Sequence, residues 1–262
     1  MIKHLFILCI LPLVCSVSTA QSYNNPESIA YDQVADRHFV SNKSGNTIVQ
    51  LDLNEKVTSF VSDDLNGPKG LLIVGDTLIS VNNTSVQGFL LSDASRVFNV
   101  LIDGAVFMND VTSDSKGSLY VSDTGAGKVY QISLKTGEYS TLVDSLVNPN
   151  GLLYDSKRNA ILICNWGQNA KIQSLNLSDS TLSDLITTDW SNLDGLTCDS
   201  AGNIYVSSWG SKAVYRFDPL FKNPPFLISE GHDGPADIFI IKEKQRLCIP
   251  NFNSNKVQFV DL

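Results

Sequence analysis

A short phrase recurs six times along the chain at nearly even spacing, and it constrains the fold more than any other feature. Each copy has a turn residue, usually Pro, then a variable residue, then most often Gly or Asp. The variable residues lie 42, 40, 41, 44 and 42 positions apart. They are Glu27, Lys69, Asn109, Asn150, Asp194 and Ala236. A period near 40 residues with strand-like content between the phrases predicts an all-β fold, a six-bladed β-propeller.

The residues between two phrases follow one order. A short apolar run, such as residues 71–74, comes first, and a tight turn follows it. The second strand ends in Asn or Asp in five units, at Asn42, Asn82, Asp123, Asn165 and Asn251, and in Ser208 in the fifth unit. A third strand alternates apolar and polar residues, and a more polar fourth strand closes most units. The order predicts four-stranded antiparallel blades.

The sixth unit ends at Leu262 with its third strand. We therefore expect residues 22–25, just before the first phrase, to supply the fourth strand and close the ring. That pairing would hide two sheet edges.

The first twenty residues differ from the rest. Residues 5–17 are almost wholly apolar, and Ser18, Thr19 and Ala20 form a small-residue cleavage site. We predict a secretory signal peptide over residues 1–20, a propeller domain over residues 21–262, and a secreted or periplasmic protein. Cys15 raises the alternative of a lipoprotein, although Leu13 and Val14 do not fit the small residue expected before such a cysteine.

Charge and composition limit the partners. The formal net charge is −8, which disfavours nucleic acid and anionic membranes. No later segment is apolar enough to span a bilayer. Cys164, Cys198 and Cys248 fall in predicted strands at unrelated spacings, so we expect buried free thiols, with one disulfide as the alternative. We expect a monomer that acts on a small molecule.

The variable residues of the phrase begin the inner strands and should converge on the propeller axis. Glu27, Asn109, Asn150 and Asp194 supply carboxylate and amide oxygens, which suit a divalent cation. Ca²⁺ is the expected ion, with Mg²⁺, Mn²⁺ or Zn²⁺ as alternatives. Asn and Asp also favour such turns by bonding their own backbone. Lys69 is the discordant member, because its ammonium could fill the channel or hold an oxyanion or carboxylate of a substrate.

Antiparallel strands alternate direction, so the turns after the second strands should surround the channel mouth on the same side as the phrases. The residues at these turns are Lys43, Asn83, Thr124, Trp166, Trp209 and Phe252. The aromatic ones make one side of the mouth apolar. His232, before the sixth phrase, is a secondary candidate for substrate contact or proton transfer. The alternative is a histidine of a surface loop without such a role. His38 reads as a packed residue.

The repeat resembles that of the senescence-marker, gluconolactonase and luciferin-regenerating-enzyme family, over the whole mature chain. The resemblance implies one divalent cation on the axis. It would be bound by Glu27 in Pro-Glu-Ser, Asn109 in Asn-Asp, Asn150 in Pro-Asn-Gly and Asp194 in Asp-Gly. It also implies lactone hydrolysis, with Asp194 taking a proton from the attacking water.

The chain departs from the family pattern at Phe107, where members often carry an Arg that helps to hold a sugar lactone. With the aromatic residues of the mouth, Phe107 favours a more apolar lactone or ester. The blades also resemble NHL repeats, which are mostly binding modules. The sequence thus leaves two functions open: a cation-dependent lactone or ester hydrolase, or a non-catalytic propeller that binds a ligand or protein at its mouth.

Overall fold

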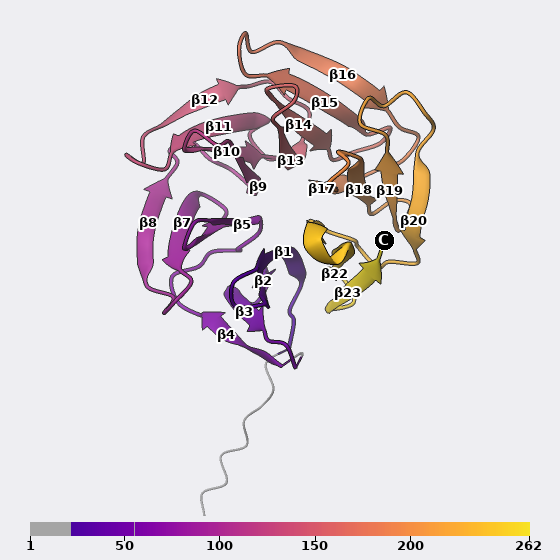
Figure 1. Ribbon diagram of the computed structural model, residues 1–262. Coiled ribbons are helices and arrows are strands. Elements are labelled where there is room, and N and C mark those ends of the chain that lie inside the picture. The colour runs from indigo at the N-terminus through magenta and orange to yellow at the C-terminus, as the bar shows by residue number, and fades with distance from the viewer. Residues whose placement is uncertain (1–21, 55) are drawn as a thin grey trace, which may run out of the picture.

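The computed structural model describes residues 22–54 and 56–262, which form a six-bladed β-propeller (Figure 1). Six antiparallel sheets stand around a central axis, and the strands of each sheet follow one another in chain order from the axis outward. The predicted fold class is confirmed. The predicted signal peptide over residues 1–20 and Cys15 lie outside the described residues.

The strands are short and regular. Blade 1 has β1 (Pro26–Asp32), β2 (Arg37–Asn42), β3 (Thr47–Leu51) and β4 (Val57–Val61). Blade 2 has β5 (Leu71–Val74), β6 (Thr77–Val81), β7 (Ser85–Leu90) and β8 (Arg96–Leu101). Blade 3 has β9 (Met108–Ser113), β10 (Ser118–Asp123), β11 (Lys128–Ser133) and β12 (Tyr139–Val143).

The second half of the ring follows the same plan. Blade 4 has β13 (Pro149–Asp155), β14 (Ala160–Asn165), β15 (Lys171–Asn176) and β16 (Leu182–Thr187). Blade 5 has β17 (Leu193–Cys198), β18 (Ile204–Ser208), β19 (Ala213–Phe217) and β20 (Phe226–Glu230). Blade 6 has β21 (Phe239–Ile241), β22 (Arg246–Asn251) and β23 (Lys256–Asp261), with a 3-10 helix (Lys242–Lys244) between the first two.

Blade 6 stays three-stranded, so the prediction that residues 22–25 supply its fourth strand is wrong. Asn25 has a φ of 52°, which takes the chain out of the extended conformation before β1. Its backbone N–H donates to Asn255 Oδ1 at 2.7 Å, and its Nδ2 donates to Phe252 O at 3.0 Å. The segment is therefore held at the turn between β22 and β23, away from the outer edge of the blade.

The hydrophobic core lies between the blades rather than in one centre. Six clusters of buried side chains each join two adjacent blades. One of them closes the ring, because Ile29, Val40 and Val49 of blade 1 pack against Ile241 and Cys248 of blade 6. A twisted four-stranded sheet is apolar on both faces of its inner strands, so each blade is stable only between two neighbours.

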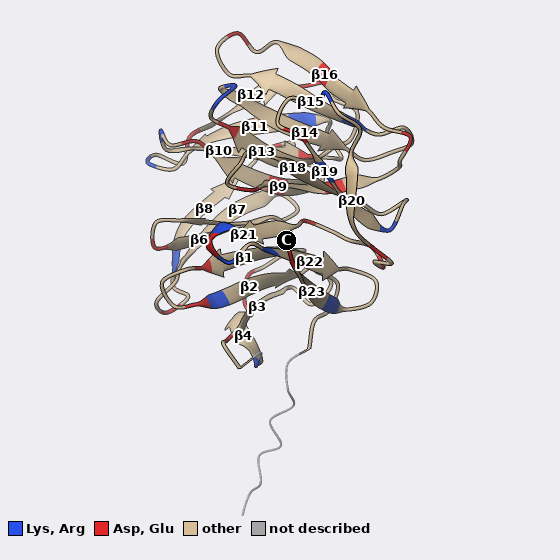
Figure 2. Cartoon of the chain, turned by 45° about the vertical axis from the view of Figure 1, so that its right-hand side comes forward, with Lys and Arg blue, Asp and Glu red and all other residues tan. Residues whose placement is uncertain are grey.

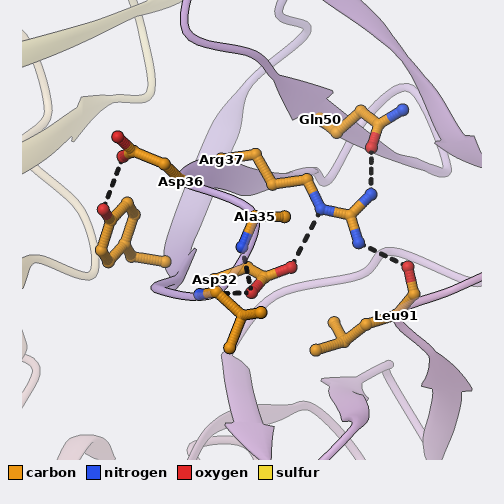
Figure 3. Close-up of polar contacts among 8 residues, drawn as sticks. Asp32, Ala35, Asp36, Arg37, Gln50 and Leu91 are labelled. Carbon is orange, nitrogen blue, oxygen red and sulfur yellow. Dashed lines mark hydrogen bonds and ion pairs between the residues drawn. The ribbon is translucent and has the colours of Figure 1, made fainter.

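Polar contacts add to the packing between blades 1 and 2 (Figure 3). The Arg37 guanidinium donates to Asp32 Oδ2 at 3.1 Å, to Gln50 Oε1 at 2.8 Å and to Leu91 O at 2.5 Å. The first two partners belong to blade 1 and the third to the turn after β7, so one side chain links two blades. The planar guanidinium supplies donors in the fixed directions that such a link needs.

The Asn or Asp that ends most second strands has a structural role. Asn42, Asn82 and Asn251 each accept, through Oδ1, a backbone N–H from the loop before the phrase, at 3.0 to 3.1 Å. Asp123 accepts two such N–H groups, from Val106 and Phe107, at 2.9 Å each. These bonds position four of the six phrases, because a buried carbonyl or carboxylate oxygen satisfies a loop amide that no strand can reach.

Charged side chains are interspersed around the ring, without a single basic face (Figure 2). No helix in residues 22–54 and 56–262 is long and apolar enough to cross a membrane. Cys164, Cys198 and Cys248 are free thiols, as expected, although Cys198 is only half-buried.

His38 is a packed side chain between blades 1 and 6. Its ring lies 5.1 Å from that of Tyr31 and 5.2 Å from that of Phe259. Burial, followed by the nearby charge of Lys244, lowers the pKa of His38 to about 4. Between about pH 6.5 and about pH 4, His38 is therefore protonated in the unfolded chain but neutral in the folded protein. The free energy of unfolding falls as the pH falls through this range.

We predict that His38→Phe reduces this loss of stability in acid. Because the ring is half-buried and water screens its charge, we expect the variant to recover ~1–2 kcal/mol at pH 4 relative to pH 7. Urea unfolding at both pH values, with the native protein in parallel, measures the difference. An unchanged difference between the two pH values would show that His38 does not contribute to acid lability.

Candidate metal and substrate site

The candidate site is built on β-bulges at the start of four inner strands. The strand register shifts within the phrase in β1, β9, β13 and β17, between residues 26 and 29, 108 and 111, 149 and 152, and 193 and 196. Glu27, Asn109, Asn150 and Asp194 all lie in these bulges. A bulge re-aims the side chain that it carries. In blades 2 and 6 the phrase lies before the first residue of the inner strand, and its variable residues are Lys69 and Ala236.

One oxygen from each bulged residue has no hydrogen-bond partner, although all four are buried. These atoms are Glu27 Oε2, Asn109 Oδ1, Asn150 Oδ1 and Asp194 Oδ1. Buried polar atoms are almost always paired in folded proteins, so four orphaned oxygens at equivalent positions of one ring require an explanation. Two carboxylates and two amides are the donor set that a hard divalent cation prefers. The residues present therefore fit such an ion.

No group of three or more His, Cys, Asp or Glu within the described part of the chain could hold a metal. A cation on the axis thus depends on the two amide oxygens as well as on the carboxylates. This composition disfavours a zinc site of the His and Cys type.

Side chains of neighbouring strands fix these residues. Trp209 Nε1 donates to Asp194 Oδ2 at 2.6 Å, which leaves Oδ1 as the orphaned oxygen. Ser122 Oγ donates to Asn150 O at 2.6 Å, and Cys164 Sγ donates to Asp194 O at 2.8 Å. The second strands of blades 3 and 4 thus position the ligand residues of blades 4 and 5.

These supporting residues were missed in the sequence, although they leave a signal there. A small residue with a hydroxyl or thiol precedes the end of the second strand in four units, at Ser41, Ser122, Cys164 and Ser207. Ser41, Ser122 and Ser207 each accept the backbone N–H that the bulge in their own blade leaves unpaired, at 2.8 to 3.0 Å. Aligning the six units on that position would have identified them.

The residue after each ligand lies where adjacent inner strands meet. A Cβ on Gly151 would lie 2.0 Å from Asp194 O, and one on Gly195 would lie 2.4 Å from Ile238 N. Asp110 occupies the same position in blade 3 and accepts the Leu152 N–H of blade 4 at 2.6 Å. The position therefore takes either no side chain or one that bonds the next blade.

Burial dominates the electrostatics of the axis. It raises the pKa of Asp194 to about 7, against the bond from Trp209, which lowers it. It raises the pKa of Glu27 well above its usual range, and the charge of Asp194 adds to this. Burial also raises the pKa of Asp110 to about 7. The axis holds more negative charge than its own cations compensate, which is the environment that stabilises a bound cation.

Lys69 does not fill the position of a cation on the axis. Its Nζ donates to Gly67 O at 3.1 Å and to Asn83 Oδ1 at 2.8 Å, and it lies 4.4 Å from the centre of the Phe107 ring. Two oxygens and an aromatic face together hold the ammonium at the side of the mouth. Burial lowers the pKa of Lys69 to about 8, partly offset by the charge of Glu27.

A cavity of about 290 Å³ opens above the orphaned oxygens. It is lined by the four bulged residues together with Lys43, Lys69, Phe107, Thr124, Trp166, Trp209 and Phe252. The three aromatic rings of blades 4 to 6 form a continuous wall, with ring centres 5.2 Å apart from Trp166 to Trp209 and 5.3 Å apart from Trp209 to Phe252. The structure brings these predicted site residues together in one place.

His232 is the exception, because it does not line this cavity. It is 2% exposed, so its reading as a surface-loop histidine is also wrong. Its Nδ1 lies 2.9 Å from Gln258 Oε1, and its Nε2 lies 2.9 Å from Ser229 Oγ. The ring bridges blades 5 and 6, and both of its nitrogens are used there. The position of His232 in the sequence, just before the sixth phrase, did not predict where its side chain points.

Comparison with known proteins adds a family and a set of related folds. The sequence profile of the SMP-30/gluconolactonase/LRE-like region matches residues 25–222. No match was found among curated proteins.

Several solved structures share the fold. A gluconolactonase from Xanthomonas campestris is 14% identical, with 88% of this chain and 84% of that chain aligned at a TM-score of 0.76. Regucalcin, a calcium-binding protein from Agrobacterium tumefaciens, is 16% identical over 88% and 83% of the two chains, at a TM-score of 0.74. Virginiamycin B lyase from Staphylococcus aureus is 14% identical over 91% and 85%, at 0.70. At these identities the likeness extends to the fold alone.

We predict that Gly151→Ala disrupts the site through Asp194. The added methyl group would overlap Asp194 O, and backbone atoms cannot yield as a flexible side chain can. We expect a loss of ~1–3 kcal/mol in the free energy of unfolding. We also expect a change in the fluorescence of Trp209, whose indole bonds the Asp194 carboxylate.

Gly45→Ala is the matched control, because a Cβ there meets its nearest atom at 3.3 Å and the φ lies outside the left-handed region. Urea unfolding and tryptophan emission spectra of both variants provide the comparison. Equal stability of Gly151→Ala and Gly45→Ala would contradict the close approach of the two inner strands.

Proposed function

The chain belongs to the SMP-30/gluconolactonase/LRE-like family, and on that premise we propose that it is a divalent-cation-dependent hydrolase of a lactone or ester. The observation that carries the proposal is the set of four orphaned oxygens at the floor of the mouth cavity. The X. campestris neighbour is a gluconolactonase, and the A. tumefaciens neighbour is calcium-binding. Both facts agree with the chemistry of the donor set.

Glu27, Asn109, Asn150 and Asp194 are the residues that would hold the cation. Two carboxylates and two amide oxygens leave further positions for water or substrate around Ca²⁺, which accepts 6–8 oxygen ligands. When bound, a divalent cation polarises the substrate carbonyl and stabilises negative charge that develops on its oxygen.

Asp194 is the proposed proton acceptor. The bond from Trp209 Nε1 fixes the orientation of its carboxylate and leaves Oδ1 unpaired in a residue that lines the cavity. A water beside Oδ1 can transfer a proton to it as the water attacks the carbonyl carbon. The protonated carboxyl can then return that proton to the alkoxide oxygen as the C–O bond of the lactone or ester breaks. Asn109 and Asn150 would hold the cation and the substrate, and their amide groups do not change protonation state. Lys69 supplies a fixed positive charge beside the reacting group.

The walls of the cavity favour an apolar substrate over a sugar lactone. Phe107 and the aromatic wall of Trp166, Trp209 and Phe252 contact the substrate and keep water away from the reacting carbonyl. Apart from the ligand residues and the two indole N–H groups, the polar side chains among the described residues that line the cavity are those of Lys43, Lys69 and Thr124. Thr124 already donates its hydroxyl to Pro149 O at 2.7 Å.

Export and a monomeric state are part of the proposal. They rest on the signal-like segment over residues 1–20 and on the closed ring of blades. The mass of the protein recovered from the cell exterior or periplasm would show whether cleavage follows Ala20.

We predict that Ca²⁺ stabilises the protein through the four oxygens. At 100 times Kd a bound ligand adds ~2.7 kcal/mol to stability, which calorimetry and thermal unfolding can both detect. We expect the double variant Glu27→Gln with Asp194→Ala to lose the calcium-dependent rise in Tm. Without calcium, this variant should be at least as stable as the native protein, because it removes buried charges.

Asp103→Asn is the matched control, since it removes one carboxylate from an exposed position of blade 2. Its response to calcium should equal that of the native protein. Calcium binding that survives the loss of both Glu27 and Asp194 would exclude the axial site.

We predict calcium-dependent opening of apolar lactones. Dihydrocoumarin and δ-decalactone should be hydrolysed with a higher kcat/KM than glucono-δ-lactone, and a chelator should abolish the activity. Asp194→Asn should lower kcat by about 10²-fold or more, as the loss of a general base does. Asp103→Asn again serves as the control. Calcium binding without turnover of any of these lactones would favour the non-catalytic propeller.

A further inference from the structure

The six turns around the mouth divide it into two chemically different halves. Blades 1 to 3 present Lys43, Asn83 and Thr124, and blades 4 to 6 present Trp166, Trp209 and Phe252 at the equivalent turns. In a ring of six, blade 1 stands opposite blade 4, and blade 2 stands opposite blade 5 (Figure 1). The polar and aromatic halves thus face each other across the orphaned oxygens.

Lys43 is the distinctive member of the polar half. Its Nζ lies 5.5 Å from the centre of the Phe107 ring and 5.5 Å from that of Phe252, so the ammonium stands over the mouth between two aromatic faces. It enters none of the ion pairs found among the described residues. Its charge also acts on Glu27, where it lowers the pKa. An ammonium that contacts aromatic faces and forms no ion pair keeps its capacity to bind an anion.

Lys69 places a second ammonium in the same half. Its Nζ contacts the ring of Phe107, which Lys43 also contacts. Among the residues that line the cavity, a divalent cation would balance the carboxylates Glu27 and Asp194, so Lys43 and Lys69 would be the remaining charged groups of the lining. The protein as a whole has a net charge of −8. Ammonium groups at the mouth of an otherwise acidic protein raise the local concentration of anions there.

We propose that the substrate of this site is amphipathic and anionic: a lactone or ester with an apolar body and a carboxylate remote from the scissile carbonyl. Lys43 binds the carboxylate, with Lys69 adding to the field, and the aromatic wall of blades 4 to 6 receives the apolar body. The reacting carbonyl then lies between the two, above the axis. Lys43 is on this view the residue that determines specificity. The inference rests on the proposed function and narrows its substrate class.

The test compares two esters that differ in charge alone, 4-butyryloxybenzoate and 4-butyryloxybenzamide. Their kcat/KM values are measured with the calcium-loaded protein, each divided by the hydroxide-catalysed rate of the same ester. We expect the benzoate ester to be preferred at least tenfold at low ionic strength. Lys43→Gln should reduce that preference to about twofold or less, and Lys43→Arg should retain it. Salt should weaken the preference in the native protein.

Binding provides a second readout that does not require turnover. Quenching of tryptophan fluorescence reports the affinity for 3-phenylpropionate and for its uncharged analogue 3-phenylpropanamide, with the calcium-loaded native protein and both Lys43 variants. We expect tighter binding of the carboxylate, dependent on a cationic side chain at position 43. Lys116→Gln, at an exposed turn between β9 and β10 and outside the cavity lining, is the control for overall charge.

The outcomes separate the two hypotheses. A preference for the anion that Lys43→Gln leaves unchanged would overturn the inference, because the carboxylate would then be bound by another group. Equal treatment of the charged and uncharged probes would overturn it as well. If neither ester is hydrolysed, the proposed function fails, and the binding of the two phenylpropanoids alone decides whether the mouth recognises anions.

Discussion

The close approach of the inner strands at the axis is the constraint on which the rest of the structure depends. A side chain after the variable residue of the phrase must be absent, as at Gly151 and Gly195, or must bond the neighbouring blade, as at Asp110. At this crowded point the strand bulges in four of the blades, and a bulge re-aims the side chain that it carries. The site is a consequence of the way in which the ring closes.

The same crowding explains why the axis is polar. Each bulge leaves backbone groups that the sheet cannot pair, and hydroxyl or thiol groups of the second strands satisfy several of them. The side-chain oxygens of the bulged residues have no comparable partner. Four buried acceptors without donors cost stability in the absence of a ligand, so they indicate a site maintained for binding rather than for folding.

The ring repeats one unit, and its chemistry comes from the differences between the units. Blades 1, 3, 4 and 5 contribute oxygens, whereas blade 2 contributes Lys69 and blade 6 a small Ala236. At the mouth, the turns of blades 1 to 3 are polar and those of blades 4 to 6 are aromatic, so the six repeats differ there as well. The cavity at the mouth has a floor of unpaired oxygens, an ammonium on one side and an aromatic wall on the other. Selectivity in this arrangement depends on a few side chains on a scaffold held rigid by packing between blades.

The sequence by itself determined the number of blades, the strand order and the set of residues that meet at the axis. These follow from a period near 40 residues and from alternation within strands, which are local properties of the chain. Only the tertiary structure decided where side chains point and what they bond. It turned Lys69 aside onto Asn83 and Phe107, buried His232 between two blades and left blade 6 with three strands. Those outcomes depend on contacts between blades far apart in the chain, and no repeat pattern records them.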